Sequence, residues 1–280
     1  MKYVGRTILT ITIFCVCASL LMAEEYDTHE KRLLLLGWNV ESGGNSAAAI
    51  AKQLADFEGY DLIGLCEVRL QNAERYKDAV AEGEGAHGKL STFDYRISES
   101  GGADRQMIIW DTERLILVSN AVEETSMQYG NYRAPFWVRF WFKDTEEEFI
   151  FMMNHLARGN ANIRQSQAED LDQWVQSQNI PVIAMGDYNF DYNIDEGTGN
   201  DAMNIFLSPG NFKWIRPIQI EKTNLHPKYN GVLDFLFVAQ QPDNWTVTSG
   251  ILSANFKYPD DDNTSDHRPI SGTVYIKVSE

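Results

Sequence analysis

The sequence has 280 residues, of which 44% are hydrophobic and 12% aromatic. A chain of this length and apolar content suits one large folded domain, and the composition excludes disorder over most of its length. The formal net charge of −16 repels polyanions at long range and argues against tight sequence-specific DNA binding. It does not exclude catalysis on phosphodiesters, because a bound metal and a few local cations invert the field inside a cleft.

The first 23 residues have the layout of a secretory signal peptide. Lys2 and Arg6 precede an uncharged apolar run over 8–22, which is shorter than the roughly 20 residues of a spanning helix, and Ala23 stands before an acidic pair. We therefore expect a signal peptide over 1–23, a short lead-in over 24–32, and a single secreted or periplasmic domain over 33–280. An uncleaved anchor is the alternative.

In chain order, apolar runs predict buried strands over 33–40 and 61–68, separated by an amphipathic helix over 46–57 with Ser46 as its N-cap. Shorter runs predict strands over 93–97, 106–110, 115–118, 136–142 and 149–154. A second amphipathic helix is expected over 163–178, followed by strands over 181–185, ending at Gly186, and over 232–238 and 273–278. Many strands with few helices favour two packed sheets covered by helices. Cys66, in the apolar run of the second strand, is expected to be buried and unreactive.

Polar side chains stand at the ends of several of these strands, where α/β scaffolds place their sites. A single Asp there is usually a turn or cap residue, and a strand-end His is usually structural. Asp234 differs, because an isolated carboxylate between Leu233 and Phe235 is costly unless it is paired. The full set is Asn39, Glu41, Glu67, Asn154, His155, Asp187, Asn189, Asp234, Asp266 and His267.

The order of six motifs resembles the endonuclease/exonuclease/phosphatase superfamily from about residue 33 to the C-terminus. The motifs are Trp38-Asn39, Glu67 after an apolar strand, Asn154-His155, Gly186-Asp187-Tyr188-Asn189, Leu233-Asp234 and Ser265-Asp266-His267. Each is common by chance, but all six in this order are specific. The resemblance implies an α/β fold, a four-layered α/β/β/α sandwich of two mixed or antiparallel sheets flanked by helices. It also implies hydrolysis of phosphoesters with Mg²⁺, or with Mn²⁺ or Ca²⁺ in its place.

Within the superfamily, the chain is most similar to deoxyribonuclease I-like members. Arg133-Ala134-Pro135 resembles their Arg-x-Pro strand entry, and the segment over 212–217, which contains Trp214, resembles their Phe-x-Trp-x-x-Pro segment. His155 stands where they have a second catalytic His. Glu41 departs from them, because an acidic residue two positions after the Asn is usual in exonuclease III-like and many phosphatase members.

The resemblance implies a role for each of these positions. Hard carboxylate oxygens suit Mg²⁺, so the implied metal ligands are Glu67, Asn39, Glu41 and Asp266. Asp187 and Asn189 would position or deprotonate the attacking water. His267, oriented by Asp234, would bind or protonate the phosphoryl group, and His155 would make a second His contact with Asp104 as its partner. Arg133, Asn189 and Trp214 would bind the substrate. Which His is acid and which is base stays open.

The sequence thus predicts a secreted, metal-dependent phosphodiesterase, first of all a non-specific endonuclease on nucleic acid. The alternative is a phosphatase or phosphodiesterase on a lipid or small-molecule phosphate, similar to a sphingomyelinase, which Glu41 and the acidic charge keep open. A non-catalytic binding module ranks last, because no expected catalytic position is substituted. We expect a monomer with no obligate protein partner and, once the leader is cleaved, no stable membrane anchor.

Overall fold

The computed structural model describes residues 30–41, 46–86, 88, 92–253 and 264–278. The predicted signal peptide and residues 24–29 of the predicted lead-in lie outside this part of the chain. Within it, no helix is both long enough and apolar enough to cross a membrane.

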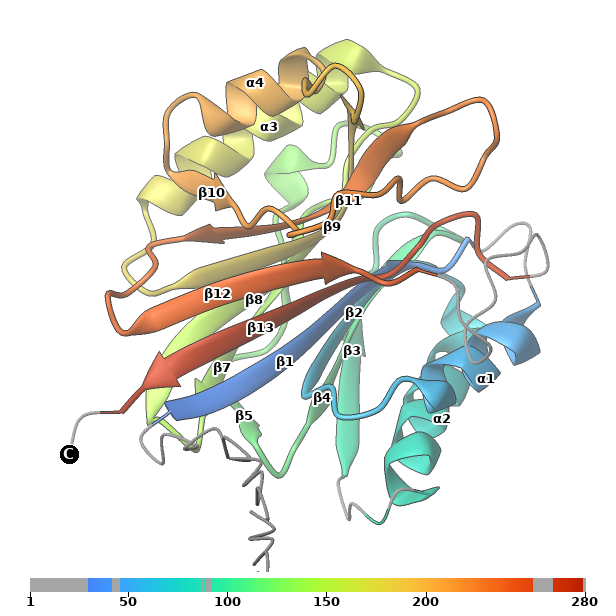
Figure 1. Cartoon of the computed structure of the whole chain (residues 1–280), viewed down its shortest axis with the longest axis vertical. Helices are drawn as coiled ribbons and strands as arrows, with labels where there is room; N and C mark the ends of the chain where they lie inside the picture. Colours follow the sequence, from blue (N-terminus) through green and yellow to red (C-terminus); the bar gives the residue numbers. More distant parts are fainter. Residues whose placement is uncertain (1–29, 42–45, 87, 89–91, 254–263, 279–280) are drawn as a thin grey trace, which may run out of the picture.

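Two mixed sheets form the centre of the molecule (Figure 1). The first has the strand order β12-β13-β1-β2-β4-β3, and in it β1 and β2 run parallel. Its strands are β1 (Glu30–Asn39), β2 (Leu62–Val68), β3 (Phe93–Ile97), β4 (Arg105–Asp111), β12 (Trp245–Ile251) and β13 (Ile270–Lys277). The second has the order β10-β11-β9-β8-β7-β5, with β6 beside β7, and in it β8 and β9 run parallel. Its strands are β5 (Leu115–Leu117), β6 (Val122–Glu123), β7 (Phe136–Phe142), β8 (Glu147–His155), β9 (Val182–Asn193), β10 (Phe212–Trp214) and β11 (Gly231–Ala239).

Helices cover the outer face of each sheet, which gives four layers (Figure 1). Helices α1 (Ala47–Asp56) and α2 (Ala73–Ala86) pack on the first sheet, through a cluster that includes Trp38 and Leu54. Helices α3 (Ala161–Gln176) and α4 (Asp201–Leu207) cover the second, through a cluster that includes Leu171 and Phe206. The short 3-10 helices η1 (Leu70–Asn72) and η2 (Thr125–Met127) lie in connections. The predicted α/β fold of two sheets flanked by helices is confirmed.

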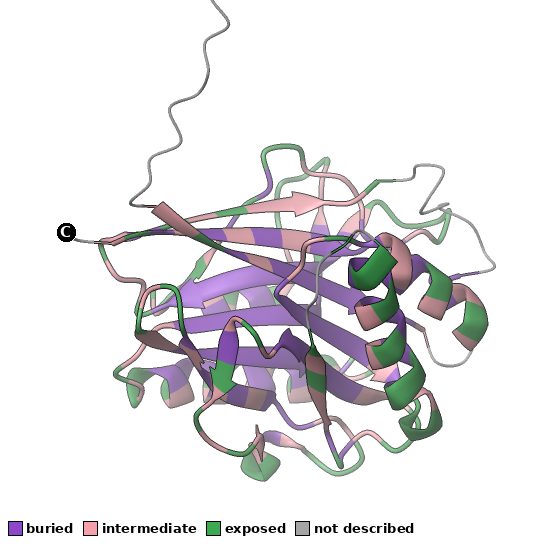
Figure 2. Cartoon of the chain, turned by 90° about the horizontal axis from the view of Figure 1, so that it is seen from below, coloured by how far each residue is buried: buried purple, intermediate pink, exposed green. Residues whose placement is uncertain are grey.

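The residue pattern of the strands explains why the sheets face each other. Along β7, Phe136, Val138, Phe140 and Phe142 are buried, while the residues between them are half-buried. The buried set points into the cluster between the sheets, and Trp137 packs on the other side against Trp174 of α3, with ring centroids 5.8 Å apart. Figure 2 shows the strands as the most continuously buried part of the molecule. A period of two thus separates the inner and outer faces of the strand.

Most predicted helices and strands are present with shifted ends. Two of the shifts matter here, one at the start of the domain and one in the strand that carries Asp187. β1 begins at Glu30, so residues 30–32 of the predicted lead-in already belong to the sheet. The predicted end of a strand at Gly186 is wrong, because β9 continues to Asn193. The reason is the alternation of buried aromatic residues beyond Gly186 and the pairing of Asn193 with Gly231 of β11. Helices α2 and α4 and strands β6, β10 and β12 were not predicted from the sequence.

Candidate active site

The polar residues from the strand ends meet at one end of the two sheets. Nδ2 of Asn39, at the end of β1, lies 3.1 Å from Oε1 of Glu67 on β2 and 3.1 Å from Oδ2 of Asp187 on β9. This one carboxamide therefore joins a residue of the first sheet to a residue of the second. It presents nitrogen to both carboxylates, and its Oδ1 accepts a hydrogen bond from the amide of Glu41 at 3.0 Å. In this arrangement Asn39 positions the two carboxylates, whereas the sequence predicted it as a metal ligand.

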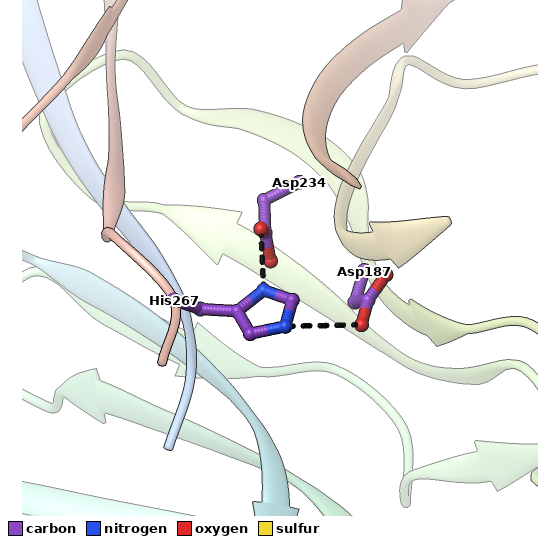
Figure 3. Close-up of side chains that lie close together, drawn as sticks. All are labelled: Asp187, Asp234 and His267. Atoms are coloured by element: carbon purple, nitrogen blue, oxygen red, sulfur yellow. Dashed lines mark hydrogen bonds and ion pairs between the residues drawn. The ribbon is translucent and has the colours of Figure 1, made fainter. Parts of the chain in front are cut away.

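His267 lies between two buried aspartates (Figure 3). Its Nδ1 is 2.7 Å from Oδ2 of Asp234 on β11, and its Nε2 is 3.9 Å from Oδ2 of Asp187. The main chain of His267 is held by Ser265, whose Oγ accepts from the His267 amide at 3.0 Å. The indole of Trp38 donates to the His267 carbonyl at 2.9 Å. His267 thus has one nitrogen paired and the other directed into the site, as predicted for Asp234 and His267.

The charges around His267 determine its protonation. Burial lowers the pKa of His267, but the carboxylate of Asp234, and after it those of Asp187 and Asp266, outweigh burial and raise it above the usual value. Burial raises the pKa of Asp187; the charge of His267 lowers it again, and that of Asp234 raises it. A protonated imidazole therefore faces a carboxyl group with increased proton affinity. This is the kind of pair that general acid–base chemistry uses.

His155, the last residue of β8, lies on the other side of Asp187. Its Nε2 is 3.5 Å from Oδ2 of Asp187 and 3.9 Å from Oε1 of Glu67. Burial, and then the positive charge of Arg133, lower the pKa of His155 well below its usual value, so the ring is neutral at pH 7. The predicted pairing of His155 with Asp104 is wrong. In the part of the chain that the structure describes, Nδ1 of His155 is buried with no hydrogen-bond partner. Asp104 lies in a turn in which its amide donates to the Gly101 carbonyl at 2.9 Å.

Carboxylates gather at the rim of the site and would suit a divalent cation. The amide of Asp266 donates to Oε2 of Glu41 at 3.2 Å, and Asp266 Oδ1 lies 3.7 Å from Nε2 of His267. Burial, and after it the charge of Asp266, raise the pKa of Glu41, and the charge of Glu67 adds to this. Like charges held this close destabilise one another, and a hard cation with oxygen ligands relieves that repulsion. Glu67, Glu41 and Asp266, the rim carboxylates, therefore have the chemistry that suits a divalent cation, although they are not among the residues whose ligand atoms all lie within 4.8 Å of one another.

Another possible cation site is the trio of Asp187, Asp234 and His267, whose ligand atoms lie within 4.8 Å of one another. Nδ1 of His267 is already bound to Asp234 at 2.7 Å, so a cation there would have to replace a charge-assisted hydrogen bond. Glu67 accepts instead from the neutral carboxamide of Asn39, at 3.1 Å, and this longer contact is easier to replace, which favours Glu67 as a ligand.

The backbone is strained at three of the predicted site residues. Glu41, Glu67 and Asn189 have φ values of 47°, 60° and 50°, in the left-handed region that favours glycine. The pairing of β2 with β4 also shifts register between Leu65 and Val68, next to Glu67, and that of β11 shifts between Val232 and Asp234. Strain and bulges of this kind concentrate at functional sites, where they aim side chains.

Two of the three predicted substrate-binding residues lie at the site, and the third does not. Nε of Arg133 donates to the His155 carbonyl at 3.3 Å, and the amide of Asn189 donates to Oδ1 of Asp187 at 3.0 Å. Trp214 instead packs against Tyr192 and Phe235, with ring centroids 4.9 and 5.3 Å apart. Its partner across the β10–β11 ladder is Phe237, three residues beyond Asp234. Trp214 therefore packs between strands in the described structure.

A cavity adjoins Asn189, and its other lining residues were not predicted from the sequence as site residues. The cavity has a volume of about 260 Å³, and its lining includes four asparagines, Arg158, Asp191 and Tyr229. Arg158 follows His155 by three residues, and its charge acts on the pKa of His155. The position of Arg158, directly after a strand with a predicted catalytic His, is the sequence feature that could have identified it as a site residue. The asparagines had no such feature, because Asn is common in ordinary turns.

Gly186 permits the close approach of β9 to β8 that places Asp187 beside His155. Its φ is 131°, and a Cβ atom there would overlap with the carbonyl oxygen of Asn154. We expect Gly186→Ala to lower the free energy of unfolding by at least about 2 kcal/mol, as measured in urea. The matched control is Gly85→Ala in α2, where φ is not positive and a Cβ would meet no atom within 4 Å. Equal stability of the two variants would contradict this account of Gly186.

The four-layered sandwich, with a buried His–Asp pair next to convergent carboxylates, defines the class of α/β/β/α phosphoester hydrolases. The chain belongs to the endonuclease/exonuclease/phosphatase family, whose model matches residues 36–267. The family-level resemblance predicted from the six motifs is therefore confirmed. Enzymes of this family generally depend on a divalent metal. No curated protein sequence gives a match.

Solved structures share the fold at low sequence identity. An endonuclease/exonuclease/phosphatase family protein from Bacteroides thetaiotaomicron is 16% identical, with a TM-score of 0.66, and the match covers 89% of this chain and 99% of that one. A mannosyl-6-phosphatase from the same organism is 18% identical, with a TM-score of 0.62 over 86% and 99%. D. rerio TDP2 complexed with single strand DNA product is 16% identical, with a TM-score of 0.66 over 87% and 99%. At these identities the likeness concerns the fold.

Proposed function

We propose that the protein is a Mg²⁺-dependent phosphoesterase in which Asp187 and His267 form the acid–base pair. The observation that supports this most directly is the 3.9 Å gap between Oδ2 of Asp187 and Nε2 of His267. This separation is longer than a hydrogen bond, so the two groups face each other across the site, and Oδ2 of Asp187 also accepts from Nδ2 of Asn39 at 3.1 Å. Asp187 takes a proton from the attacking water, whose oxygen bonds to phosphorus. As the bond between phosphorus and the ester oxygen breaks, protonated His267 donates a proton to the departing ester oxygen, and the proton taken up by Asp187 returns through solvent to restore His267.

Other residues of the site neutralise and orient the phosphate. Glu67, with Glu41 and Asp266, would hold the Mg²⁺, or Mn²⁺ or Ca²⁺ in its place, and the bound ion would supply Lewis-acid polarisation of a phosphoryl oxygen. Neutral His155 donates from Nε2 to a second phosphoryl oxygen. Arg133, whose charge already acts on His155, offsets the charge of the phosphate.

Two classes of substrate are each supported by a separate observation. Nucleic acid, the class that the sequence favours, is supported by Arg133 next to His155 and is consistent with TDP2 among the fold relatives. A small phosphate ester is supported by the cavity next to Asn189 and by the net charge of −16, and is consistent with the mannosyl-6-phosphatase among them. Export from the cytoplasm, which rests on the first 23 residues alone, is part of the proposal for either class.

Hydrolysis of bis-p-nitrophenyl phosphate and p-nitrophenyl phosphate tests the proposed reaction. We expect release of p-nitrophenol with Mg²⁺, its loss in EDTA, and its return when excess Mg²⁺ is added. Nicking of supercoiled plasmid under the same conditions reports on nucleic acid as a substrate. The absence of hydrolysis of every ester with Mg²⁺, Mn²⁺ and Ca²⁺ would overturn the proposal and favour a non-catalytic module on this fold.

A further inference from the structure

A polar cavity lies beside the second half of β9, beyond Asp187, between that strand and the segment over 224–233. Its volume is about 260 Å³, and its lining includes Arg158, Asn189, Asn193, Asn224, Tyr229 and Asn230. We propose that this cavity binds a single hydroxyl-rich ring, a sugar that carries the scissile phosphate. The inference rests on the proposed function, since it assigns the substrate class of the same site.

The walls of the cavity are the chain neighbours of the acid–base residues. Asn189 follows Asp187 by two residues, and its amide donates to Oδ1 of that aspartate. Asn224 forms an isolated β-bridge with His267. Leu233, which also lines the cavity, directly precedes Asp234. A group in the cavity therefore lies next to a phosphate held by Asp187 and His267.

The cavity offers both donors and acceptors from carboxamides that are already fixed in place. Oδ1 of Asn193 accepts from the Asp195 amide at 2.9 Å and Oδ1 of Asn224 from the His226 amide at 2.9 Å, which leaves both Nδ2 groups as donors. Nδ2 of Asn189 donates to the Leu156 carbonyl at 3.2 Å, which leaves its Oδ1 as an acceptor.

Asn230 adds a further acceptor, because its Nδ2 donates to Asp195 at 2.9 Å and its Oδ1 is left for a ligand. Asn189 and Asn224 are only 2% and 5% exposed. A hydroxyl group both donates and accepts, so a ring with several hydroxyls satisfies such a mixture. A hydrocarbon chain would leave these buried amides unpaired at considerable cost.

Size, shape and charge restrict the ligand further. Drug-sized ligands occupy cavities of about 300–1,000 Å³, so a cavity just below this range accommodates roughly one ring. Tyr229, which is 55% exposed, offers an aromatic face for the C–H face of a sugar ring. A nucleic-acid duplex is too wide to enter, and the net charge of −16 repels a long polyanion. These properties favour a sugar phosphate over nucleic acid and over a lipid.

The test compares substrates across pocket variants of the full chain with Mg²⁺. The substrates are glucose 6-phosphate, ribose 5-phosphate, a nucleoside monophosphate, p-nitrophenyl phosphate, phosphatidylinositol phosphate vesicles and a single-stranded oligonucleotide. For Tyr229→Ala and Asn230→Ala, we expect kcat/KM for the best sugar phosphate to fall at least about tenfold, the effect of about one lost contact. The fall for p-nitrophenyl phosphate should be at least about fivefold smaller, because that ester has no hydroxyls to bind. Lys228→Ala, an exposed neighbour that does not line the cavity, is the control and should match wild type.

Three results would overturn the inference and can be told apart from failure of the proposed function. One is a kcat/KM for the oligonucleotide or the lipid above that for every sugar phosphate. Another is an equal loss for sugar phosphates and p-nitrophenyl phosphate in the pocket variants. The third is hydrolysis of p-nitrophenyl phosphate but of no sugar phosphate, which rejects the pocket assignment while the phosphoesterase proposal stands. If wild type hydrolyses no ester with any metal, both fail together.

Discussion

Replacing His267 with alanine is expected to slow the hydrolysis of bis-p-nitrophenyl phosphate by at least about 100-fold, which is the usual range for loss of an acid–base or phosphoryl-binding group. The imidazole is held by Asp234 at 2.7 Å and faces Asp187 across a gap. Without it, the phosphoryl group and the leaving oxygen lose a cationic donor, and Asp187 loses the positive charge that lowers its pKa. Initial rates at saturating Mg²⁺, with circular dichroism to verify the fold, measure the effect.

The matched control for that prediction is His226→Ala. His226 is an exposed loop residue whose ring is tilted against that of Tyr229, with ring centroids 5.1 Å apart, and it lies outside the acid–base group. We expect this variant to retain most of the activity on bis-p-nitrophenyl phosphate. Equal rates for His267→Ala and wild type would show that the acid–base assignment is wrong.

The convergence of the site was predictable because it follows from strand ends. Asn39 and Glu67 end neighbouring parallel strands, and His155 and Asp187 belong to a second parallel pair. Carboxyl ends of parallel strands meet at one edge, so residues far apart in sequence must come together there. That Asp234 needs a partner also follows from the sequence, since a carboxylate within an apolar strand is costly alone. The choice of His267 came from the family resemblance, and the structure shows that hydrogen bond at 2.7 Å.

The parts that were not predictable depend on contacts across the fold. The extension of β9 past Gly186 depends on pairing with β11, and a glycine after an apolar run locally resembles a strand end. The role of Asp104 was inferred from its position in the sequence alone. In the structure its amide donates to the Gly101 carbonyl, and Nδ1 of His155 has no hydrogen-bond partner among the described residues. Part of the cavity lining comes from a loop with no hydrophobic periodicity, and in the sequence its asparagines look like turn residues. The structure shows that Asn224 of this loop forms a β-bridge with His267.

The positions of three predicted substrate contacts bear on the class of substrate. Three matches favoured DNA at the level of sequence, and they involved Arg133, His155 and Trp214. Arg133 and His155 lie together at the site, where they suit any phosphate ester. Trp214 packs against Tyr192 and Phe235 within the second sheet, so its match reflects the fold more than the substrate. The balance therefore moves toward the small-ester class that Glu41 and the acidic charge had kept open.

The choice of Glu67 as a metal ligand leads to the second large expected effect. Glu67→Gln keeps the shape of the side chain and an oxygen that accepts from Asn39, but it removes one negative charge from the rim carboxylates. We expect the Mg²⁺ concentration for half-maximal activity to rise at least about tenfold, since changes around a metal site typically cost 10- to 100-fold in affinity or activity. A Mg²⁺ titration of bis-p-nitrophenyl phosphate hydrolysis, with calorimetry of Mg²⁺ binding, measures this.

Two further variants make the metal titration decisive. Glu74→Gln removes a charge from an exposed residue of α2 that pairs only with Lys77 among the described ion pairs, and it should leave the Mg²⁺ titration unchanged. Asp234→Asn should reduce the rate through His267 but leave the Mg²⁺ midpoint near that of wild type, because Asp234 is bound to Nδ1 of the imidazole. If instead Asp234→Asn shifts the midpoint and Glu67→Gln does not, the cation binds at the Asp187–Asp234–His267 trio, and the rim carboxylates serve another purpose.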